Sequence, residues 1–177
     1  MATAANFTDL DKDLTEADPL EMRKVLGHFA TGVVAITGID ADGVPTGLAA
    51  NSFTSVSLEP PLVAFCVART STSWPRLRSN DAVAINILSD GQEHVCRQLS
   101  TRGPEKFSGL GWCPSPSGAP ILDDSLACLE VTPEVEHPAG DHTIVVCRVR
   151  RLRASALAPL IFFRGAYGEY ASTAAGR

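Results

Sequence analysis

Short apolar runs, each closed by turn-forming residues, set the strongest limit on what this chain can fold into. The runs are rich in Val, Ile, Leu and Phe, and Pro, Gly, Asp or Ser stands beside each of them. They cover residues 33–37, 44–48, 49–57, 62–67, 82–88, 126–135, 143–149 and 160–163. Runs of this kind are typical of β-strands, and all are far shorter than the roughly 18 apolar residues of a membrane-spanning helix. The pattern predicts about seven or eight strands and no membrane span.

Helical patterns are few. The first predicts an amphipathic helix that begins after Asp18, a residue able to cap it, and ends near Gly32. Its apolar residues at helical spacing are Met22, Val25, Leu26 and Phe29. Two further helices are predicted, a short one after Trp74 and Pro75 and one over residues 92–99 with an apolar stripe.

Because the strands do not alternate regularly with helices, the pattern disfavours a doubly wound parallel sheet. Antiparallel strands in a chain of 177 residues leave exposed edges unless the sheet closes on itself. We therefore predict a mainly β fold, a Greek-key barrel with a few peripheral helices. It forms one domain over residues 18–170, between an N-terminal tail of residues 1–17 that lacks apolar periodicity and a flexible C-terminal tail of residues 171–177.

Charge and cysteine content limit the partners and the compartment. Lys and Arg number 15 against 20 Asp and Glu, and the net charge of −5 gives no general attraction to nucleic acid. The N-terminal residues are polar and acidic, so we expect no signal peptide. Five cysteines without a CxxC pair argue against a disulfide framework. We expect a cytoplasmic protein with reduced thiols that binds neither nucleic acid nor membrane.

Missing motifs exclude several classes of enzyme. The sequence has no GxxxxGK[ST] phosphate loop, no HExxH, no GxSxG and no acidic calcium loop. Gly109-Leu110-Gly111 lacks the third glycine of a dinucleotide fingerprint. His28, His94 and His137 are scattered and have no Cys or carboxylate at metal-ligand spacing, so we expect no metal.

Hydroxyl side chains are concentrated in two windows, residues 51–57 and 70–74. Strand alternation in the first window separates odd-numbered from even-numbered residues, so about half of its hydroxyls would converge on one face. The second window runs into a helix N-terminus, whose backbone N–H groups suit a phosphate. One interpretation is an uncharged phosphate site without a basic patch, and the other is that these hydroxyls only cap turns and cover exposed strand faces.

Three further features each allow two interpretations. His142 could be an ordinary surface group or a functional one, and because strand neighbours point to opposite faces, it is not expected to pair with Asp141. The four arginines within residues 148–153 could protect a sheet edge or dock a partner. Residues 160–167 could be an ordinary strand end or the rim of a pocket that stacks a flat ligand.

Taken together, ordered segments of the chain resemble the small flavin reductases of two-component flavin-dependent monooxygenases, from about Asp18 to Tyr167. The segments that carry this resemblance are residues 29–33 (FATGV), 51–62 (NSFTSVSLEPPL), 71–74 (STSW), 84–88 (AINIL), 140–142 (GDH) and 159–165 (PLIFFRG). The resemblance implies a split β-barrel, usually a homodimer, that binds FMN or FAD and lets NADH or NADPH reduce it. Reduced flavin would reach a partner monooxygenase by diffusion or transient contact.

The same resemblance implies roles for individual residues. The flavin-ring contacts would be Thr31, Gly32, Val33, Ala49, Ala50, Asn51, Ser52 and Phe53. The ribityl and phosphate side would be Ser55, Ser57, Ser71, Thr72, Ser73 and Trp74. The nicotinamide side would be Gly140, Asp141, His142, Arg164 and Tyr167, with His142 as the catalytic candidate because a planar polar group can position the carboxamide.

Hydride transfer from nicotinamide C4 to flavin N5 needs no protein nucleophile, which agrees with the missing hydrolase motifs. Backbone amides at Asn51 and Ser52 are candidates to stabilise the reduced flavin. Two alternatives stay open at this point. One is a flavin- or heme-binding split barrel without turnover, and the other is an assembly module that docks through the arginines at 148–153.

Overall fold

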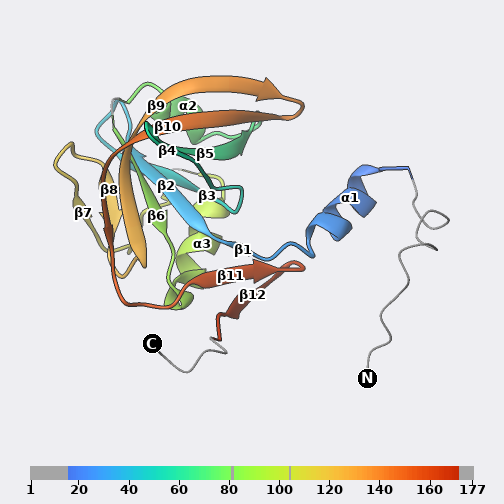
Figure 1. Cartoon of the computed structure of the whole chain (residues 1–177). Helices are drawn as coiled ribbons and strands as arrows, with labels where there is room; N and C mark the ends of the chain where they lie inside the picture. Colours follow the sequence, from blue (N-terminus) through green and yellow to red (C-terminus); the bar gives the residue numbers. More distant parts are fainter. Residues whose placement is uncertain (1–15, 81, 104, 172–177) are drawn as a thin grey trace.

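The computed structural model describes residues 16–80, 82–103 and 105–171 and shows a mainly β molecule (Figure 1). The predicted tails fall largely outside this part, since residues 1–15 and 172–177 lie beyond the described residues. Within it, no helix is long and apolar enough to cross a membrane. All five cysteines are free thiols.

Twelve strands and three α-helices make up the described chain. The strands of the large sheet are Val34–Ile39 (β2), Pro45–Ala50 (β3), Thr54–Leu58 (β4), Pro61–Ala68 (β5), Val83–Ile87 (β6), Ala127–Ala139 (β9) and His142–Ala154 (β10). The other strands are Thr31–Gly32 (β1), Trp112–Pro114 (β7), Pro120–Leu122 (β8), Leu160–Phe163 (β11) and Ala166–Glu169 (β12). The helices are Pro19–Leu26 (α1), Trp74–Leu77 (α2) and Glu93–Ser100 (α3), and a 3₁₀ turn, Asp90–Gln92, leads into α3.

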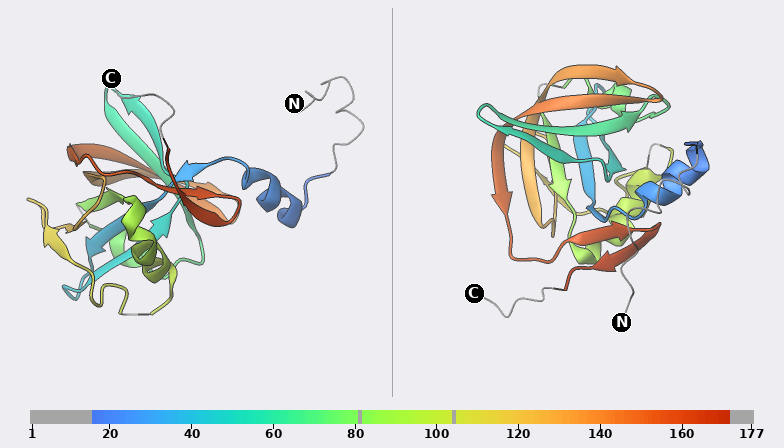
Figure 2. Two further views of the ribbon diagram at one scale, coloured as in Figure 1. Left: turned by 90° about the horizontal axis from the view of Figure 1, so that it is seen from below. Right: turned by 45° about the vertical axis from the view of Figure 1, so that its right-hand side comes forward.

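The large sheet has the strand order β3-β2-β6-β9-β10-β5-β4, and all of its pairs are antiparallel. The strands β1, β11 and β12 form a separate sheet, and β7 pairs with β8 in a hairpin. Figures 1 and 2 show the large sheet curving around a central core, with the helices outside it. The predicted mainly β barrel with a few peripheral helices is confirmed.

The barrel closes through a side chain where strand pairing ends. The strands β3 and β4 are the two edges of the large sheet, and residues 51–53 join them. At this join the hydroxyl oxygen of Ser52 accepts a hydrogen bond from the backbone N–H of Cys66 (2.9 Å) and donates one to its carbonyl oxygen (3.1 Å). In the described chain β3 and β5 are not paired as strands, and we call this place the seam; Ser52 bridges it through its two hydrogen bonds to Cys66.

Side chains of β2 and of Val33, just before it, alternate between two apolar clusters. Val34 and Ile36 pack inside the barrel with Phe65 and Trp74, whose rings meet edge to face at 5.3 Å. Val33 and Ala35, on the other face, pack against the buried stripe of α3, formed by Val95, Cys96 and Leu99. The predicted helix over residues 92–99 and its apolar stripe are confirmed.

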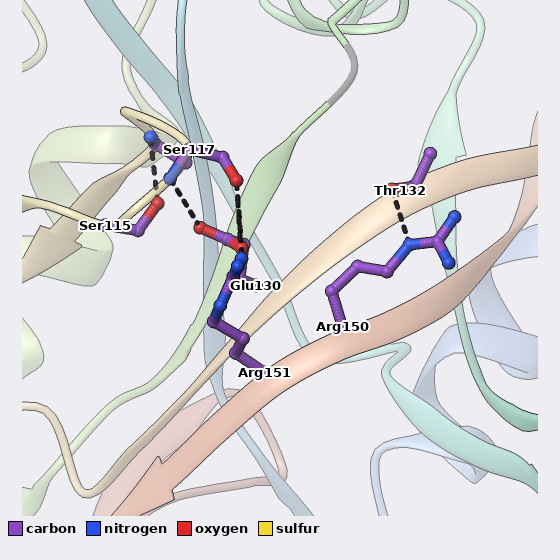
Figure 3. A network of polar contacts seen from close by, with 7 residues as sticks. Ser115, Ser117, Glu130, Thr132, Arg150 and Arg151 are labelled. Atoms are coloured by element: carbon purple, nitrogen blue, oxygen red, sulfur yellow. Dashed lines mark hydrogen bonds and ion pairs between the residues drawn. The ribbon is translucent and has the colours of Figure 1, made fainter.

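Buried polar groups fix the β7–β8 hairpin against the outside of the barrel. The Asn86 side chain accepts a hydrogen bond from the N–H of Leu122 (3.0 Å) and donates one to Thr37 Oγ1 (2.9 Å). The Thr37 hydroxyl in turn donates a hydrogen bond to the carbonyl of Pro120 (2.6 Å). At the hairpin tip, Ser117 donates its N–H and its hydroxyl to the Glu130 carboxylate, both at 3.1 Å (Figure 3). Both ends of the hairpin are thus held by side chains of the large sheet.

The arginines of β10 make most of their contacts within the sheet. Arg151 forms an ion pair with Glu130, and Arg150 donates to Thr132 Oγ1 (3.1 Å), as Figure 3 shows. Burial raises the pKa of Glu130, but hydrogen bonds from Ser115, Ser117 and Arg151 outweigh that effect and hold the pKa below its usual value. Arg151 also donates to Ser117 Oγ (3.5 Å) of the β7–β8 hairpin, and the other contacts are Arg148 with Glu134 and Arg153 Nε with Cys128 Sγ.

Two expectations about the N-terminal half are wrong. The first helix ends at Leu26 instead of near Gly32, because residues 31–32 pair with β11 as strand β1 and the carbonyl of Gly27 accepts the N–H of Arg164 (2.8 Å). The strand expected over residues 49–57 is interrupted at 51–53, where the chain crosses the seam. In both places tertiary contacts outweigh the local pattern.

A variant of the seam serine tests whether this contact closes the barrel. We expect Ser52→Ala to lower the free energy of unfolding by about 1–3 kcal/mol, because the N–H and the carbonyl of Cys66 would lose their partner. The matched control is Ser55→Ala, at an exposed residue whose hydroxyl makes no hydrogen bond within the described chain, with an expected change under about 0.5 kcal/mol. Urea unfolding measures both, and equal stabilities would contradict the role of Ser52.

Candidate functional site

A cleft with two adjoining cavities lies beside the seam. The first, about 380 Å³, lies between the ends of β3 and β5, the loop of residues 70–73 and the end of α3; we call it the hydroxyl cavity. The second, about 180 Å³, is the aromatic cavity, with Phe162 and Tyr167 in its wall. Ala49, Ala50, Asn51 and Ser100 line both, so the two cavities adjoin, and we call them together the cleft.

The loop after β5 supplies the hydroxyl groups. Ser71 Oγ accepts the N–H of Trp74 (3.2 Å) at the start of α2, and Ser73 Oγ accepts a hydrogen bond from Lys106 Nζ (2.9 Å). Thr72, between them, is exposed. Since the oxygens of Ser71 and Ser73 already accept hydrogen bonds, each hydroxyl keeps its own proton to donate, and the pair therefore favours a ligand that accepts hydrogen bonds.

Two cations also line the hydroxyl cavity, Lys106 and the exposed Arg102. Lys106 is buried, and its Nζ lies 2.8 Å from the Leu99 carbonyl and 3.2 Å from the Gly47 carbonyl. Burial, with a smaller contribution from the charge of Arg76, lowers the pKa of Lys106. The expectation of an uncharged phosphate site is therefore wrong, and no spacing in the sequence indicated that these two residues reach the cleft.

Asp141 and His142 are paired, contrary to the expectation from strand alternation. His142 Nδ1 lies 2.7 Å from Asp141 Oδ1, and hydrogen bonding from His142 lowers the pKa of the Asp141 carboxyl. The reason is that β10 begins at His142, so Asp141 lies in the turn after Gly140, whose φ is +62°, and does not follow strand geometry. His142, opposite Ala68 of β5, lines the hydroxyl cavity.

The wall of the aromatic cavity is held by several contacts of Tyr167. Its ring lies 5.3 Å from that of Phe162, and the guanidinium of Arg97 lies over it at 5.1 Å. Its hydroxyl is 3.1 Å from Cys96 Sγ. Burial and the contact with Cys96 raise the pKa of Tyr167 to about 12, so this phenol stays protonated at neutral pH.

The structure gathers about half of the sequence-predicted site residues in the cleft. Those that line one or both cavities are Val33, Ala49, Ala50, Asn51, Ser52, Ser71, Thr72, Ser73, His142 and Tyr167. Those that line neither are Thr31, Gly32, Phe53, Ser55, Ser57, Trp74, Gly140, Asp141 and Arg164. The cleft residues that sequence reasoning missed include Cys96, Ser100, Arg102 and Lys106.

Several placements have clear physical causes. Asn51 and Ser52 line the same cavity, although alternation predicted opposite faces, because the chain has left the strand there. Trp74 is buried in the barrel core, and its Nε1 donates to Glu136 (3.2 Å). Tyr167 lies beside the predicted ring contacts Val33 and Asn51, in the aromatic cavity and not in the cavity that His142 lines.

The donor set of the cleft fits a phosphorylated flavin. Hydroxyls with free protons and a buried ammonium suit a phosphate ester, and the aromatic cavity suits a flat ring. Thr31 Oγ1, in strand β1, is buried without a hydrogen-bond partner in the described chain. Across residues 16–80, 82–103 and 105–171, no three His, Cys, Asp or Glu side chains lie together as metal ligands.

Known proteins of one kind are similar to this chain. Residues 26–171 match the family described as Flavin reductase like domain. The chain is 45% identical over 151 residues to the reductase subunit HsaB of a flavin-dependent monooxygenase from Rhodococcus jostii (strain RHA1), covering 85% of this chain and 77% of that protein. It is 44% identical over 156 residues to a flavin reductase from Pseudomonas putida, covering 88% and 92%.

A solved structure agrees with these relatives. The NADH:FAD oxidoreductase SgcE6 of Streptomyces globisporus C-1027, in complex with NAD and FAD fragments, superposes with a TM-score of 0.84 at 33% identity, covering 91% of this chain and 99% of that one. The resemblance found in the sequence is confirmed. With this fold, this cleft and these relatives, the chain belongs to the flavin reductase-like family.

Proposed function

We propose that this protein is an NAD(P)H:flavin oxidoreductase that reduces FMN or FAD by hydride transfer and supplies the reduced flavin to a separate monooxygenase. The observation that carries the proposal is the pair of adjoining cavities, with donor hydroxyls and a buried cation in one and an aromatic wall in the other. The names of similar proteins support it: a reductase subunit of a flavin-dependent monooxygenase, a flavin reductase and an NADH:FAD oxidoreductase.

The two cavities would hold different parts of the flavin. The aromatic cavity, with Val33, Phe162 and Tyr167, would receive the ring, and Ser71, Thr72 and Ser73 would bind the phosphate side. A bound flavin supplies the hydride-accepting chemistry, so the chain needs no nucleophile of its own.

Backbone donors at the seam suit the charge that a flavin gains on reduction. The β2–β3 ladder ends at the pair Val34 and Ala50, so the N–H groups of Asn51 and Ser52 lie outside it. No turn or loop hydrogen bond in the described chain uses these two N–H groups. They are available to donate to a ligand without any charged side chain.

His142 is the proposed nicotinamide-positioning residue. Its contact with Asp141 orients the imidazole and leaves the second ring nitrogen for a ligand. Because His142 and the hydroxyl loop line the same cavity, NADH or NADPH would bind transiently beside the flavin. A flavin that must pass to another enzyme is better bound as a substrate than retained.

A homodimer would cover the apolar face of α1. Leu20, Met22, Val25 and Leu26 are each more than half exposed. In Figure 1 and in the left view of Figure 2, α1 projects away from the barrel. The contacts that hold its end are the hydrogen bond from Arg164 to Gly27 and the edge-to-face packing of His28 on Phe163.

The five free thiols agree with a cytoplasmic location.

An anaerobic titration tests the proposed reaction. NADH added to the protein with FMN, and separately with FAD, should bleach at least one flavin in proportion to the NADH consumed. Protein without flavin, and flavin without protein, are the controls. A flavin or heme that binds but keeps its oxidised spectrum when NADH is added would contradict the proposal and favour a cofactor-binding protein without turnover.

The role of His142 predicts a selective kinetic effect. We expect His142→Ala to raise the KM for NADH about 3- to 10-fold, the effect of one lost hydrogen bond, and to leave the KM for flavin nearly unchanged. His137→Ala, on the neighbouring strand of the same hairpin and outside the cleft, should change neither constant. Equal increases in both constants for His142→Ala would contradict the assignment.

The proposed dimer predicts a change of mass on a single substitution. Leu26→Asp places a charge on the apolar face of α1, and we expect the protein to become a monomer in sedimentation velocity runs, because burying that charge is unfavourable. Lys24→Gln, at an exposed lysine of the same helix, should leave the dimer intact. A wild-type monomer, or a dimeric Leu26→Asp variant, would contradict this interface.

A further inference from the structure

Lys106 differs from the other buried charged side chains of the described chain in having no opposite charge beside it. These buried side chains are Asp40, Lys106 and Glu130. Asp40 pairs with Arg76 and Glu130 with Arg151. Within the described residues, no carboxylate lies within 4.0 Å of Lys106 Nζ. Burial lowers the pKa of the lysine, and the charge that does act on Lys106, the positive charge of Arg76, lowers it further. A buried ammonium without a counterion is unfavourable unless something else supplies the negative charge.

The ammonium is held at the wall of the cleft. Lys106 is 7% exposed, and its three hydrogen bonds reach the carbonyls of Gly47 and Leu99 and the hydroxyl of Ser73. These contacts orient Nζ but are all to neutral groups. Since Lys106 itself lines the hydroxyl cavity, the missing counterion has a space to occupy.

The hydroxyls around that space are arranged to donate. Ser73 Oγ accepts from Lys106 and Ser71 Oγ accepts from the Trp74 N–H, which leaves both hydroxyl protons for a ligand. Arg102 adds a second, exposed cation at the same cavity. Donors and cations together favour a ligand group with several acceptor oxygens and negative charge.

We propose that Lys106 is the buried counterion for a phosphate ester in the hydroxyl cavity, acting through its positive charge and through the Ser73 hydroxyl that it orients, and that it makes the enzyme select phosphorylated flavins over riboflavin. This inference rests on the proposed reductase function. The same chemistry could recognise the pyrophosphate of NADH, but the flavin phosphate is the source we assign, because the aromatic cavity proposed for the ring adjoins the hydroxyl cavity at Ala49, Ala50 and Asn51.

Steady-state NADH oxidation with FMN and with riboflavin tests the proposal. For Lys106→Met, which removes the charge at similar length, we expect the KM for FMN to rise about 10- to 100-fold, while the KM for riboflavin changes less than about 2-fold. Arg150→Gln is the matched control, an exposed cation outside the cleft whose hydrogen bond goes to Thr132, and it should change neither constant.

A measurement on the wild-type protein keeps the test valid if Lys106→Met does not fold. Inorganic phosphate should compete with FMN and not with riboflavin, and it should raise the melting temperature more than chloride at equal ionic strength. Wild-type protein should also have a KM for FMN about 10- to 100-fold below that for riboflavin. Phosphate that competes with neither flavin would overturn the proposal.

The remaining outcomes separate the inference from the function on which it rests. If no flavin supports NADH oxidation by wild-type protein, the reductase function itself fails. If FMN and riboflavin are reduced with equal KM and Lys106→Met alters neither, reductase activity stands and the role of Lys106 is overturned. If Lys106→Met raises the KM for NADH alone, the assignment to the flavin phosphate is also overturned.

Discussion

The contact between Ser52 and the backbone of Cys66 is the constraint on which the rest of this structure depends. The two edges of the seven-stranded sheet, β3 and β4, do not pair with each other; β3 ends at Ala50, and the Ser52 hydroxyl just after it links this end of the sheet to the backbone of β5. The sheet stays curved around its core, and a gap remains at the seam. The N–H groups of residues 51 and 52 and both cavities of the cleft lie at that gap.

In this arrangement the protein binds and orients the ligands, and the flavin supplies the hydride-accepting chemistry. The cleft offers rigid walls, donor hydroxyls, backbone amides and a buried cation, which are means of binding and orienting a ligand. Tyr167 illustrates the rigidity, since Arg97, Cys96 and Phe162 all contact it. The two carboxylates that are buried in the described chain, Asp40 and Glu130, are engaged in ion pairs outside the cleft and stabilise the fold.

Strands and the core were predictable from sequence where burial and local pattern agree. The runs that became β2, β5, β6, β9 and β10 are rich in apolar residues and have turn residues at their ends. The 3₁₀ turn that leads into α3 has a capping box at Ser89, and α3 itself has an apolar stripe. The strands β1, β7, β8 and β12 have only two to four residues, which is too short for a recognisable sequence pattern. They are strands because they pair with a neighbouring strand in the folded structure.

The site was harder to predict because it is built where regular structure stops. Alternation misplaced Ser52 relative to Asn51, because both lie between β3 and β4 and outside a strand. It also separated Asp141 from His142, although Asp141 lies in the turn before β10. Lys106 comes from a loop and reaches Ser73 across 33 positions of the chain, a contact that only the packed structure creates. The family resemblance identified the residues of the cleft better than periodicity did.

A crystal structure of the protein with FMN tests the central claim of this account most directly. The account predicts that the phosphate lies within hydrogen-bond distance of Ser71, Ser73 or Lys106, and that the ring lies against Asn51 in the cavity walled by Tyr167. A flavin bound elsewhere on the molecule, with the seam between β3 and β5 filled by the protein's own side chains, would contradict it.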